Sequence, residues 1–234
     1  MYRMTDARNL TMTRILKYSL AALLTGALVL PIGLSQQYER WTHTAISTIF
    51  RAVRANEIPA PEKTIRNAII ELQQAANDER KRAFAADTVH GILQPRLNTR
   101  IVTRLVLGKY WKQASEYQQK EFERLFIRYI CGFYAGTGLL DAFQDGSGVT
   151  VTFGQTLVDG NRAVVRMNIH EPDNTYRVGF VMRDYDGVWK VVDIRMENFS
   201  IITTKRSEFG PHISQHGMGP VIDYLRKEVQ QYYN

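Results

Sequence analysis

The amino-acid sequence predicts an α+β fold in which a curved, four-stranded antiparallel meander sheet packs on amphipathic helices. Two changes of pattern predict this fold. Apolar residues recur at helical spacing up to residue 145, the period falls to two between residues 148 and 197, and helical spacing then returns. Helices before a run of strands and a helix after it are typical of α+β domains. We therefore expect one domain over residues 36–234, with a mainly helical part at 36–145, the antiparallel sheet at 148–197 and closing helices at 198–234.

Short amphipathic helices are expected over residues 36–145, beginning with one inside residues 37–56. The clearest helix starts at a capping box of Ser115 and Gln118, in which each side chain binds the backbone N–H of the other residue. It should end near Gly136. Its apolar face is strongly aromatic and contains Phe122, Leu125, Phe126, Tyr129 and Phe133. Such a face is usually plain core, but this one would also suit a roomy interior.

Residues 148–197 alternate as a sheet with one apolar and one polar face would. The turn sequences Asp159-Gly160, Glu171–Asn174 and Asp186-Gly187 separate the four strands, and the last is typical of a tight hairpin. The arginines expected on the polar face are Arg162, Arg166 and Arg177. The apolar positions are Val149, Val151 and Phe153, then Ala163, Val165, Met167 and Ile169, then Tyr176, Val178, Phe180 and Met182, then Val188, Val192, Ile194 and Met196.

The last strand should lead directly into the closing helices. Residues 197–200 read as its exit, where Phe199 can turn inward as the strand ends. The sequence Ile-Thr-Thr-Lys at residues 202–205 then begins a helical cover. A final helix is expected from Pro220 to Tyr233, and the residues expected on its inner face are Ile222, Leu225 and Val229.

The first 35 residues have the pattern of a secretory signal peptide. Four basic residues and one acidic residue precede Tyr18, no charge occurs from Tyr18 to Tyr38, and Pro31 and Gly33 follow the apolar stretch. This stretch is short of the ~20 residues that a membrane-spanning helix needs. We expect residues 1–35 to direct export, with an uncleaved N-terminal membrane anchor as the alternative.

The charge and the cysteine count exclude several kinds of protein. The chain carries a net charge of +7, and its basic residues form no run that could track a phosphate backbone, so nucleic acid is not an expected partner. Cys131 is the single cysteine, which excludes an internal disulfide and a zinc site built from cysteines. Its apolar neighbours predict a buried, unreactive thiol.

No sequence motif assembles an active site. G-x-S-x-G, H-E-x-x-H, the P-loop and G-x-G-x-x-G are all missing from the sequence. His212 and His216 stand four residues apart but have no acidic or cysteine partner nearby, so a metal site is not expected. Asp193 and Glu197 are also four apart, and solvated or helix-capping roles fit them better than a catalytic pair. We expect neither an enzyme nor a cofactor.

Several ordered motifs resemble one family. They are Val106–Trp111 followed by Ser115 and Gln118, Trp189 followed by Val191–Asp193, Glu197–Ser200 followed by Ile202–Lys205, Phe209-Gly210, and Gly217-Met218. Together they cover about residues 60–230 and are similar to the MlaC family, which is also known as the toluene-tolerance proteins and whose members are periplasmic phospholipid carriers.

The resemblance implies a protein that shuttles a diacyl phospholipid through the periplasm of a Gram-negative bacterium. Its partners would be an outer-membrane lipoprotein/porin complex and an inner-membrane ABC transporter with an MCE-domain ring, in an Mla-type system that maintains outer-membrane lipid asymmetry. The protein would act as a monomer and as the substrate-binding component, with phospholipid as cargo. The sheet and helices would then enclose an apolar cavity for the lipid, with the headgroup outside.

On this basis we expect acyl chains to lie between the apolar sheet face and the facing helices, with Tyr110 and Trp111 at the mouth of the cavity. The residues expected to bind lipid are Leu105, Val106, Tyr110, Phe126, Tyr129, Phe133, Val165, Met167, Val178, Phe180, Val192, Ile194 and Phe199.

Three alternatives remain open at this point. A related, membrane-tethered accessory protein could bind another membrane lipid, such as a hopanoid. A small curved-sheet enzyme would require a pocket with a polar dyad. A structural adaptor would have a solid core and no cavity.

Overall fold

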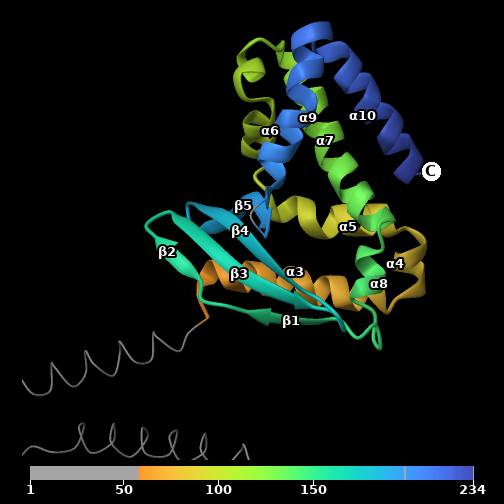
Figure 1. Cartoon of the computed structure of the whole chain (residues 1–234), viewed down its shortest axis with the longest axis vertical. Coiled ribbons are helices and arrows are strands. Elements are labelled where there is room, and N and C mark those ends of the chain that lie inside the picture. Colours follow the sequence, from red (N-terminus) through yellow and green to blue (C-terminus); the bar gives the residue numbers. More distant parts are fainter. Residues whose placement is uncertain (1–57, 198, 234) are drawn as a thin grey trace, which may run out of the picture. The chain divides into compact units, whose positions relative to one another are not determined.

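A computed structural model describes residues 58–197 and 199–233 (Figure 1). The predicted signal peptide or anchor at 1–35 and the helix expected inside 37–56 lie outside the described residues. Among the described residues, no helix is both long enough and apolar enough to cross a membrane.

The described chain is an α+β domain, as predicted. The helices before the sheet are α3 (Ala60–Ala76), α4 (Glu79–Ala83), α5 (Ala85–Leu93), α6 (Thr99–Leu107), α7 (Glu116–Gly136) and α8 (Leu139–Ala142), with 3-10 turns η1 (Gln94–Arg96) and η2 (Gly108–Lys112). The strands are β1 (Thr150–Phe153), β2 (Leu157–Asp159), β3 (Arg162–His170), β4 (Thr175–Tyr185), β5 (Val188–Met196) and β6 (Phe199–Ser200). The closing helices are α9 (Ile201–His216) and α10 (Met218–Tyr232).

Local capping explains where the main helices begin. Ser115 and Gln118 form the predicted capping box at the start of α7, with backbone N–H to side-chain oxygen distances of 3.0 and 3.2 Å. The Asn98 side chain accepts the Ile101 N–H at 3.0 Å and starts α6, while the Asn98 N–H donates to the Val191 carbonyl at 3.0 Å. The same residue therefore begins α6 and ties its start to β5.

The sheet is the expected four-stranded meander with two short strands added. The strand order is β1-β3-β4-β5-β6, and β2 pairs with the other end of β3. Asp186 and Gly187 both have positive φ angles, of 53° and 86°, which make the tight β4–β5 hairpin. Glu197 also has a positive φ, of 53°, and lies between β5 and β6. Arg162, Arg166 and Arg177 are exposed, as expected for the polar face.

A break in the β4–β5 pairing changes which residues of β5 face inward. Phe180 pairs with Ile194, but the register shifts between Val181 and Met182, so Met182 pairs with Val191. Simple alternation assigned Val192 to the inner face. The structure places Val191 there instead, in a buried cluster with Val165 and Met182, because the irregularity adds a residue to β5.

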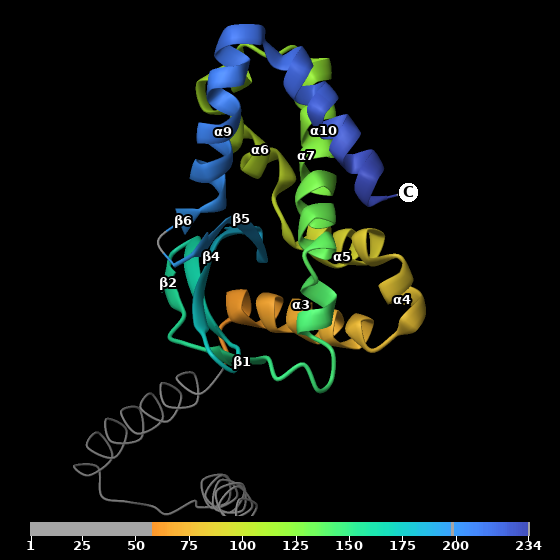
Figure 2. The same cartoon turned by 45° about the vertical axis from the view of Figure 1, so that its right-hand side comes forward.

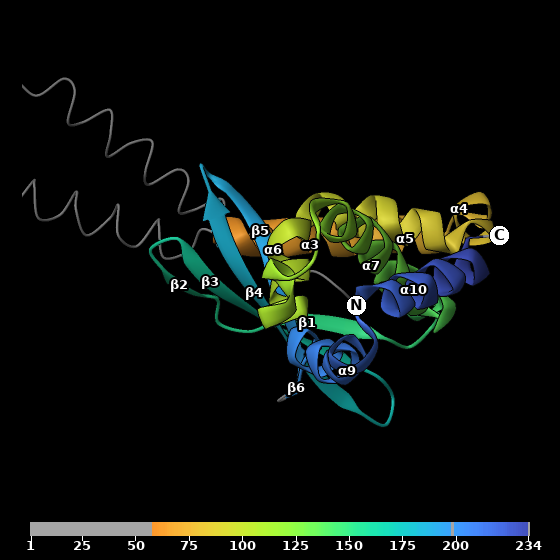
Figure 3. The ribbon, with the colours of Figure 1, turned by 90° about the horizontal axis from the view of Figure 1, so that it is seen from above.

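Two apolar clusters make up the core. The larger joins α5–α10 to the C-terminal half of α3, and the smaller joins the sheet to Ile65 of the same helix. In Figure 2, α6, α7, α9 and α10 lie above, and the sheet and α3 lie below. The view from above in Figure 3 shows α7 alongside α10. Among the described residues, Ile69 and Leu97 pack against both clusters.

Candidate functional site

An apolar cavity of about 200 Å³ lies where the two clusters meet. Its helical wall comes mainly from α3 and α7, with single residues of α5, α6 and α8, and its other wall comes from β3, β4, β5 and the start of α9. The charged residues of the lining are Arg96 and Asp193. Arg96 forms an ion pair with Glu71 at 2.5 Å, and Asp193 accepts a hydrogen bond from the Ser200 hydroxyl at 3.0 Å. Both charges are therefore engaged by neighbouring residues, and apolar side chains form the rest of the wall.

The structure brings some of the predicted lipid-binding residues together in this cavity and leaves others outside it. Those that line it are Phe126, Met167, Val178, Phe180 and Ile194. Val165 is fully buried in the sheet cluster, and Val192 is buried outside the cavity lining. Phe199 is 74% exposed, so the expectation that it turns inward is wrong.

On α6 and the turn after it, the predicted residues face away from the cavity. Leu105 is 38% exposed, whereas Val106 and Trp111 are buried in the helical cluster. Tyr110 does not line the cavity, and its ring lies near Gly210 of α9. The expectation that Tyr110 and Trp111 border the cavity mouth is therefore wrong.

The aromatic residues of α7 divide between two faces. Phe126 faces the cavity, while Tyr129 packs against Tyr224 and Tyr232 of α10 with ring centroids 6.0 and 6.5 Å apart. The Lys205 ammonium donates to the Tyr129 hydroxyl at 3.2 Å, and burial raises the pKa of Tyr129. Phe133 is partly exposed beside Tyr129. Tyr129 and Phe133 therefore belong to the helical packing and not to the cavity.

Several cavity residues were not among those expected to bind lipid. The sequence predicts short amphipathic helices over this region, but nothing in the spacing of the α3 residues distinguishes a cavity wall from ordinary core. The unpredicted lining residues on the helices include Ile65, Ile69, Leu72, Ile127, Ile130 and Cys131.

The Cys131 thiol should be nearly inert in the folded protein. The side chain is 1% exposed, and burial raises its pKa to about 12. The thiolate is the reactive form, so a rise of about three pKa units should slow labelling by a maleimide at neutral pH roughly a thousandfold relative to the urea-unfolded chain. Because Cys131 is the single cysteine, mass spectrometry of the intact protein follows this one reaction. Equal labelling rates in buffer and in urea would contradict this placement.

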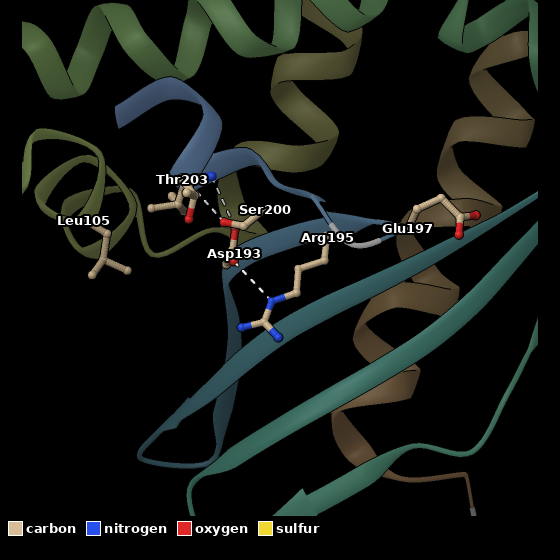
Figure 4. Close-up of a pocket in the computed structure, with 7 residues that line it drawn as sticks. Leu105, Asp193, Arg195, Glu197, Ser200 and Thr203 are labelled. Carbon is tan, nitrogen blue, oxygen red and sulfur yellow. Dashed lines mark hydrogen bonds and ion pairs between the residues drawn. The ribbon is translucent and has the colours of Figure 1, made fainter. Parts of the chain in front are cut away.

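A second, polar pocket of about 390 Å³ adjoins the apolar cavity and shares Asp193 and Ile202 with it. It lies at the junction of β5 and α9, with Leu105 and Glu197 at opposite ends (Figure 4). Arg177 donates three hydrogen bonds to Glu197, from its backbone N–H at 2.9 Å and from its guanidinium at 3.0 and 2.8 Å. These bonds lower the pKa of Glu197, first through the backbone N–H and then through the guanidinium.

No group of three or more metal-ligating side chains that could hold a metal ion occurs within residues 58–197 and 199–233. His212 and His216 both lie on α9. Asp193 supports the start of α9 by accepting from Ser200 and, at 3.4 Å, from the Ile202 N–H. The helix-capping interpretation of Asp193 is therefore confirmed.

An apolar cavity between helices and a sheet is typical of proteins that bind an apolar ligand. The family model described as "MlaC protein" matches residues 62–227, and the chain belongs to this family. MlaC proteins are periplasmic phospholipid-binding carriers and not enzymes. The expectation of a non-enzymatic protein is confirmed by this membership.

Known proteins that resemble the chain include the following two. The toluene tolerance protein ttg2D of Pseudomonas putida is 26% identical over 147 residues, which span 61% of this chain and 66% of that protein. A phospholipid-binding protein from Ralstonia solanacearum, solved in complex with a phospholipid, superposes with a TM-score of 0.64 at 21% identity. The match covers 74% of this chain and 98% of that one, and it confirms the α+β fold.

Proposed function

We propose that this protein carries a diacyl phospholipid through the periplasm, with the acyl chains in the apolar cavity. The observation that carries the proposal is the apolar lining of that cavity, in which α3 and α7 face the inner side of β3–β5. The two charged lining residues, Arg96 and Asp193, are bound by Glu71 and by the Ser200 hydroxyl. Family membership and the phospholipid bound by the Ralstonia solanacearum protein support the same cargo.

The free energy of exposing acyl chains to water determines how such a carrier must work. Two acyl chains hold roughly 30 methylenes, and at about 0.8 kcal/mol each their exposure to water would cost about 24 kcal/mol. Non-covalent affinity reaches a limit near about 18–21 kcal/mol. A carrier therefore cannot wait for lipid dissolved in water. It must exchange lipid with an apolar site on a docked donor or acceptor.

Exchange by docking requires a donor and an acceptor, and membership of the MlaC family suggests which complexes these are. We infer an outer-membrane lipoprotein/porin complex on one side and an inner-membrane ABC transporter with an MCE-domain ring on the other. The protein would act between them as the monomeric substrate-binding component of an Mla-type system that maintains outer-membrane lipid asymmetry in a Gram-negative bacterium. The energy for directional transfer then comes from the partners, which agrees with the lack of nucleotide-binding motifs in the sequence.

The cavity must widen to hold the cargo. Its volume of about 200 Å³ is below the roughly 300–1,000 Å³ of ordinary ligand pockets. The helical and sheet clusters meet at Ile69 and Leu97 within the described residues, while Ile130, Phe180 and Ile194 are only partly buried. These side chains can move apart at less cost than a continuous close-packed core would require.

The direct test is mass spectrometry of an organic extract of the purified protein, paired with uptake of lipid from phospholipid vesicles. We expect about one phospholipid for each protein chain. A different extracted lipid, such as a hopanoid, would replace phospholipid as the cargo. Absence of both extracted lipid and vesicle uptake would reject the carrier function.

A further inference from the structure

We propose that the protein binds the surface of an anionic membrane through a cationic patch on α6, η2 and α9. The patch is defined by five exposed side chains, which are Arg100, Arg104, Lys109, Lys112 and Arg206. This inference goes beyond the carrier function, because it concerns where the protein is held between exchanges and assigns no site to the cargo.

No acidic residue interrupts the part of the chain that forms most of the patch. Between Asp87 and Glu116 the sequence contains no aspartate or glutamate, and its basic residues are Arg96, Arg100, Arg104, Lys109 and Lys112. Arg96 is paired with Glu71 and is only partly exposed, so it does not belong to the patch. The other four are exposed and bring only positive charge to this surface.

Arg206 joins the patch from α9. Its guanidinium donates to the Leu105 carbonyl at 2.8 Å, and a Cβ atom added to Gly108 would lie 3.4 Å from its Nε. The carbonyl is neutral, so this contact holds the arginine against the end of α6 without cancelling its charge. The positive charges of α6 and α9 therefore lie on one surface.

The described part of the chain does not neutralise the patch. None of its five side chains forms an ion pair with a carboxylate of residues 58–197 or 199–233. Two carboxylates of α7 come near α6 and are engaged by other groups. Glu116 is bound to Lys120 at 2.7 Å, and Glu123 accepts a hydrogen bond from the Thr99 hydroxyl.

Helix stability does not account for these charges. Arg100 and Arg104 stand one turn apart on α6, where like charges destabilise a helix, and Arg100 occupies the first turn, at the positive end of the helix dipole. Lys109 and Lys112 are three residues apart in the 3-10 turn η2 and so project from the same side. Negative charge placed against the patch would relieve this repulsion, so an anionic surface is its electrostatic complement.

A bilayer fits the patch better than an acidic protein does. None of the five cations lines either pocket described above, so neither recess can seat an anchoring side chain of a docked protein among them. Attraction to a bilayer surface requires only charge and area. Leu105, which is exposed between these cations, adds an apolar side chain. Basic residues beside exposed apolar ones are typical of surfaces that lie at a membrane interface.

The expected binding is weak and depends on salt. Each lysine or arginine close to an anionic leaflet strengthens binding roughly fivefold, and the attraction falls off within a Debye length. Five such residues together strengthen binding by about a thousandfold. Binding of this strength holds a protein near a membrane and still allows it to leave, which suits the proposed carrier.

The test is sedimentation of the purified protein with vesicles of phosphatidylcholine alone or mixed with an equal amount of phosphatidylglycerol. We expect binding to the mixed vesicles, much weaker binding to phosphatidylcholine alone, and release as salt is raised. Arg104→Gln combined with Lys112→Gln should weaken binding to the mixed vesicles about 25-fold. Both side chains are exposed and have no hydrogen bond, ion pair or ring contact within the described residues, so this double variant should fold as the parent does.

Two control variants separate the position of the charges from their number. Arg80→Gln combined with Lys81→Gln removes two exposed charges from α4, which lies on the far side of α7 from α6 (Figures 1 and 3), and should bind as the parent does. Arg104→Lys combined with Lys112→Arg keeps both charges and should also bind as the parent does. All variants share residues 1–57, so any contribution of that segment cancels from the ratios of binding constants.

Several results would overturn the proposal. One is unchanged vesicle binding by the Arg104→Gln, Lys112→Gln variant, and another is an equal loss in the α4 variant. Binding of soluble polyglutamate that depends on Arg104 and Lys112, without binding to anionic vesicles, would assign the patch to an acidic protein instead.

Counting the extracted lipid separates the patch from the carrier function. Neither Arg104 nor Lys112 lines the apolar cavity, so the double variant should contain as much lipid as the parent. A loss of extracted lipid together with vesicle binding would mean that the substitutions disturb the domain, and the proposal would fail. Charge-dependent vesicle binding by a parent protein that contains no lipid would support the patch and reject the carrier.

Discussion

Replacing Gly132 with valine is expected to lower the free energy of unfolding by about 3 kcal/mol. A Cβ atom at Gly132 would lie 2.6 Å from Cβ of Tyr232 and 2.8 Å from its Cγ. Those atoms are the base of the Tyr232 side chain, so a rotation of that side chain cannot remove the clash. To remove this clash, α10 must move away from α7, and this separates one of the main helix–helix contacts of the domain. Urea unfolding followed by circular dichroism measures the loss, which should also appear as a fall in Tm of about 6–12 °C.

The matched control is Gly91→Ala in α5. An added Cβ there has no atom within 4 Å, and the position is exposed. Alanine should therefore stabilise the protein by about 0.5–1 kcal/mol through helix propensity alone. Gly132→Ala should fall between the two variants, because the same propensity gain offsets part of its clash. A Gly132→Val protein as stable as the parent would mean that α7 and α10 do not pack as closely as described.

The two sides of α7 have different neighbours, and this explains why its run of bulky residues is interrupted by a glycine. Cys131 and Phe126 face the cavity, while Gly132 and Tyr129 face α10. One helix thus supplies both a wall of the cavity and the packing surface of the closing helix. Helical periodicity alone groups these aromatic residues on one apolar stripe, since the stripe is wide enough to cover both faces.

Local signals in the sequence were sufficient for much of the fold. The capping box of α7, its end at Gly136 and the Asp186-Gly187 hairpin each depend on a few neighbouring residues, and the structure agrees with all three. The inner face of α10, with Ile222, Leu225 and Val229 buried, also follows from spacing. These features could be predicted because their chemistry is contained in one short segment.

The parts of the site that could not be predicted depend on tertiary pairing. The irregularity opposite Val181 and Met182 moves Val191 into the place that alternation gave to Val192. Leu105 was expected to bind lipid, yet α6 buries Val102 and Val106 and leaves Leu105 at the polar pocket. Phe199 was expected to turn inward as the strand ends, but β6 pairs only at the end of β5 and leaves the ring in solvent.

Replacing Ile194 with tryptophan is expected to reduce bound phospholipid roughly tenfold while the protein stays folded. Ile194 lines the cavity from β5 and is only partly buried, so a larger ring at this position extends into space that acyl chains would occupy. Displacing about two methylenes from the cavity costs about 1.6 kcal/mol of binding free energy, which corresponds to a little more than tenfold in affinity. Mass spectrometry of the extracted lipid, measured per folded protein chain, gives the result.

Val188→Trp is the matched control, because it adds an indole to the same strand at an exposed position outside the cavity. It should leave bound lipid unchanged. If Ile194→Trp keeps its full complement of lipid, the acyl chains lie elsewhere and the cavity is not the cargo site. If it unfolds, Ile194 is part of a tightly packed core and the cavity wall does not adapt to a larger side chain. If the cavity wall is adaptable, the variant should fold with less bound lipid. The wall can then accommodate the indole ring, and the ring fills space that the acyl chains would otherwise occupy.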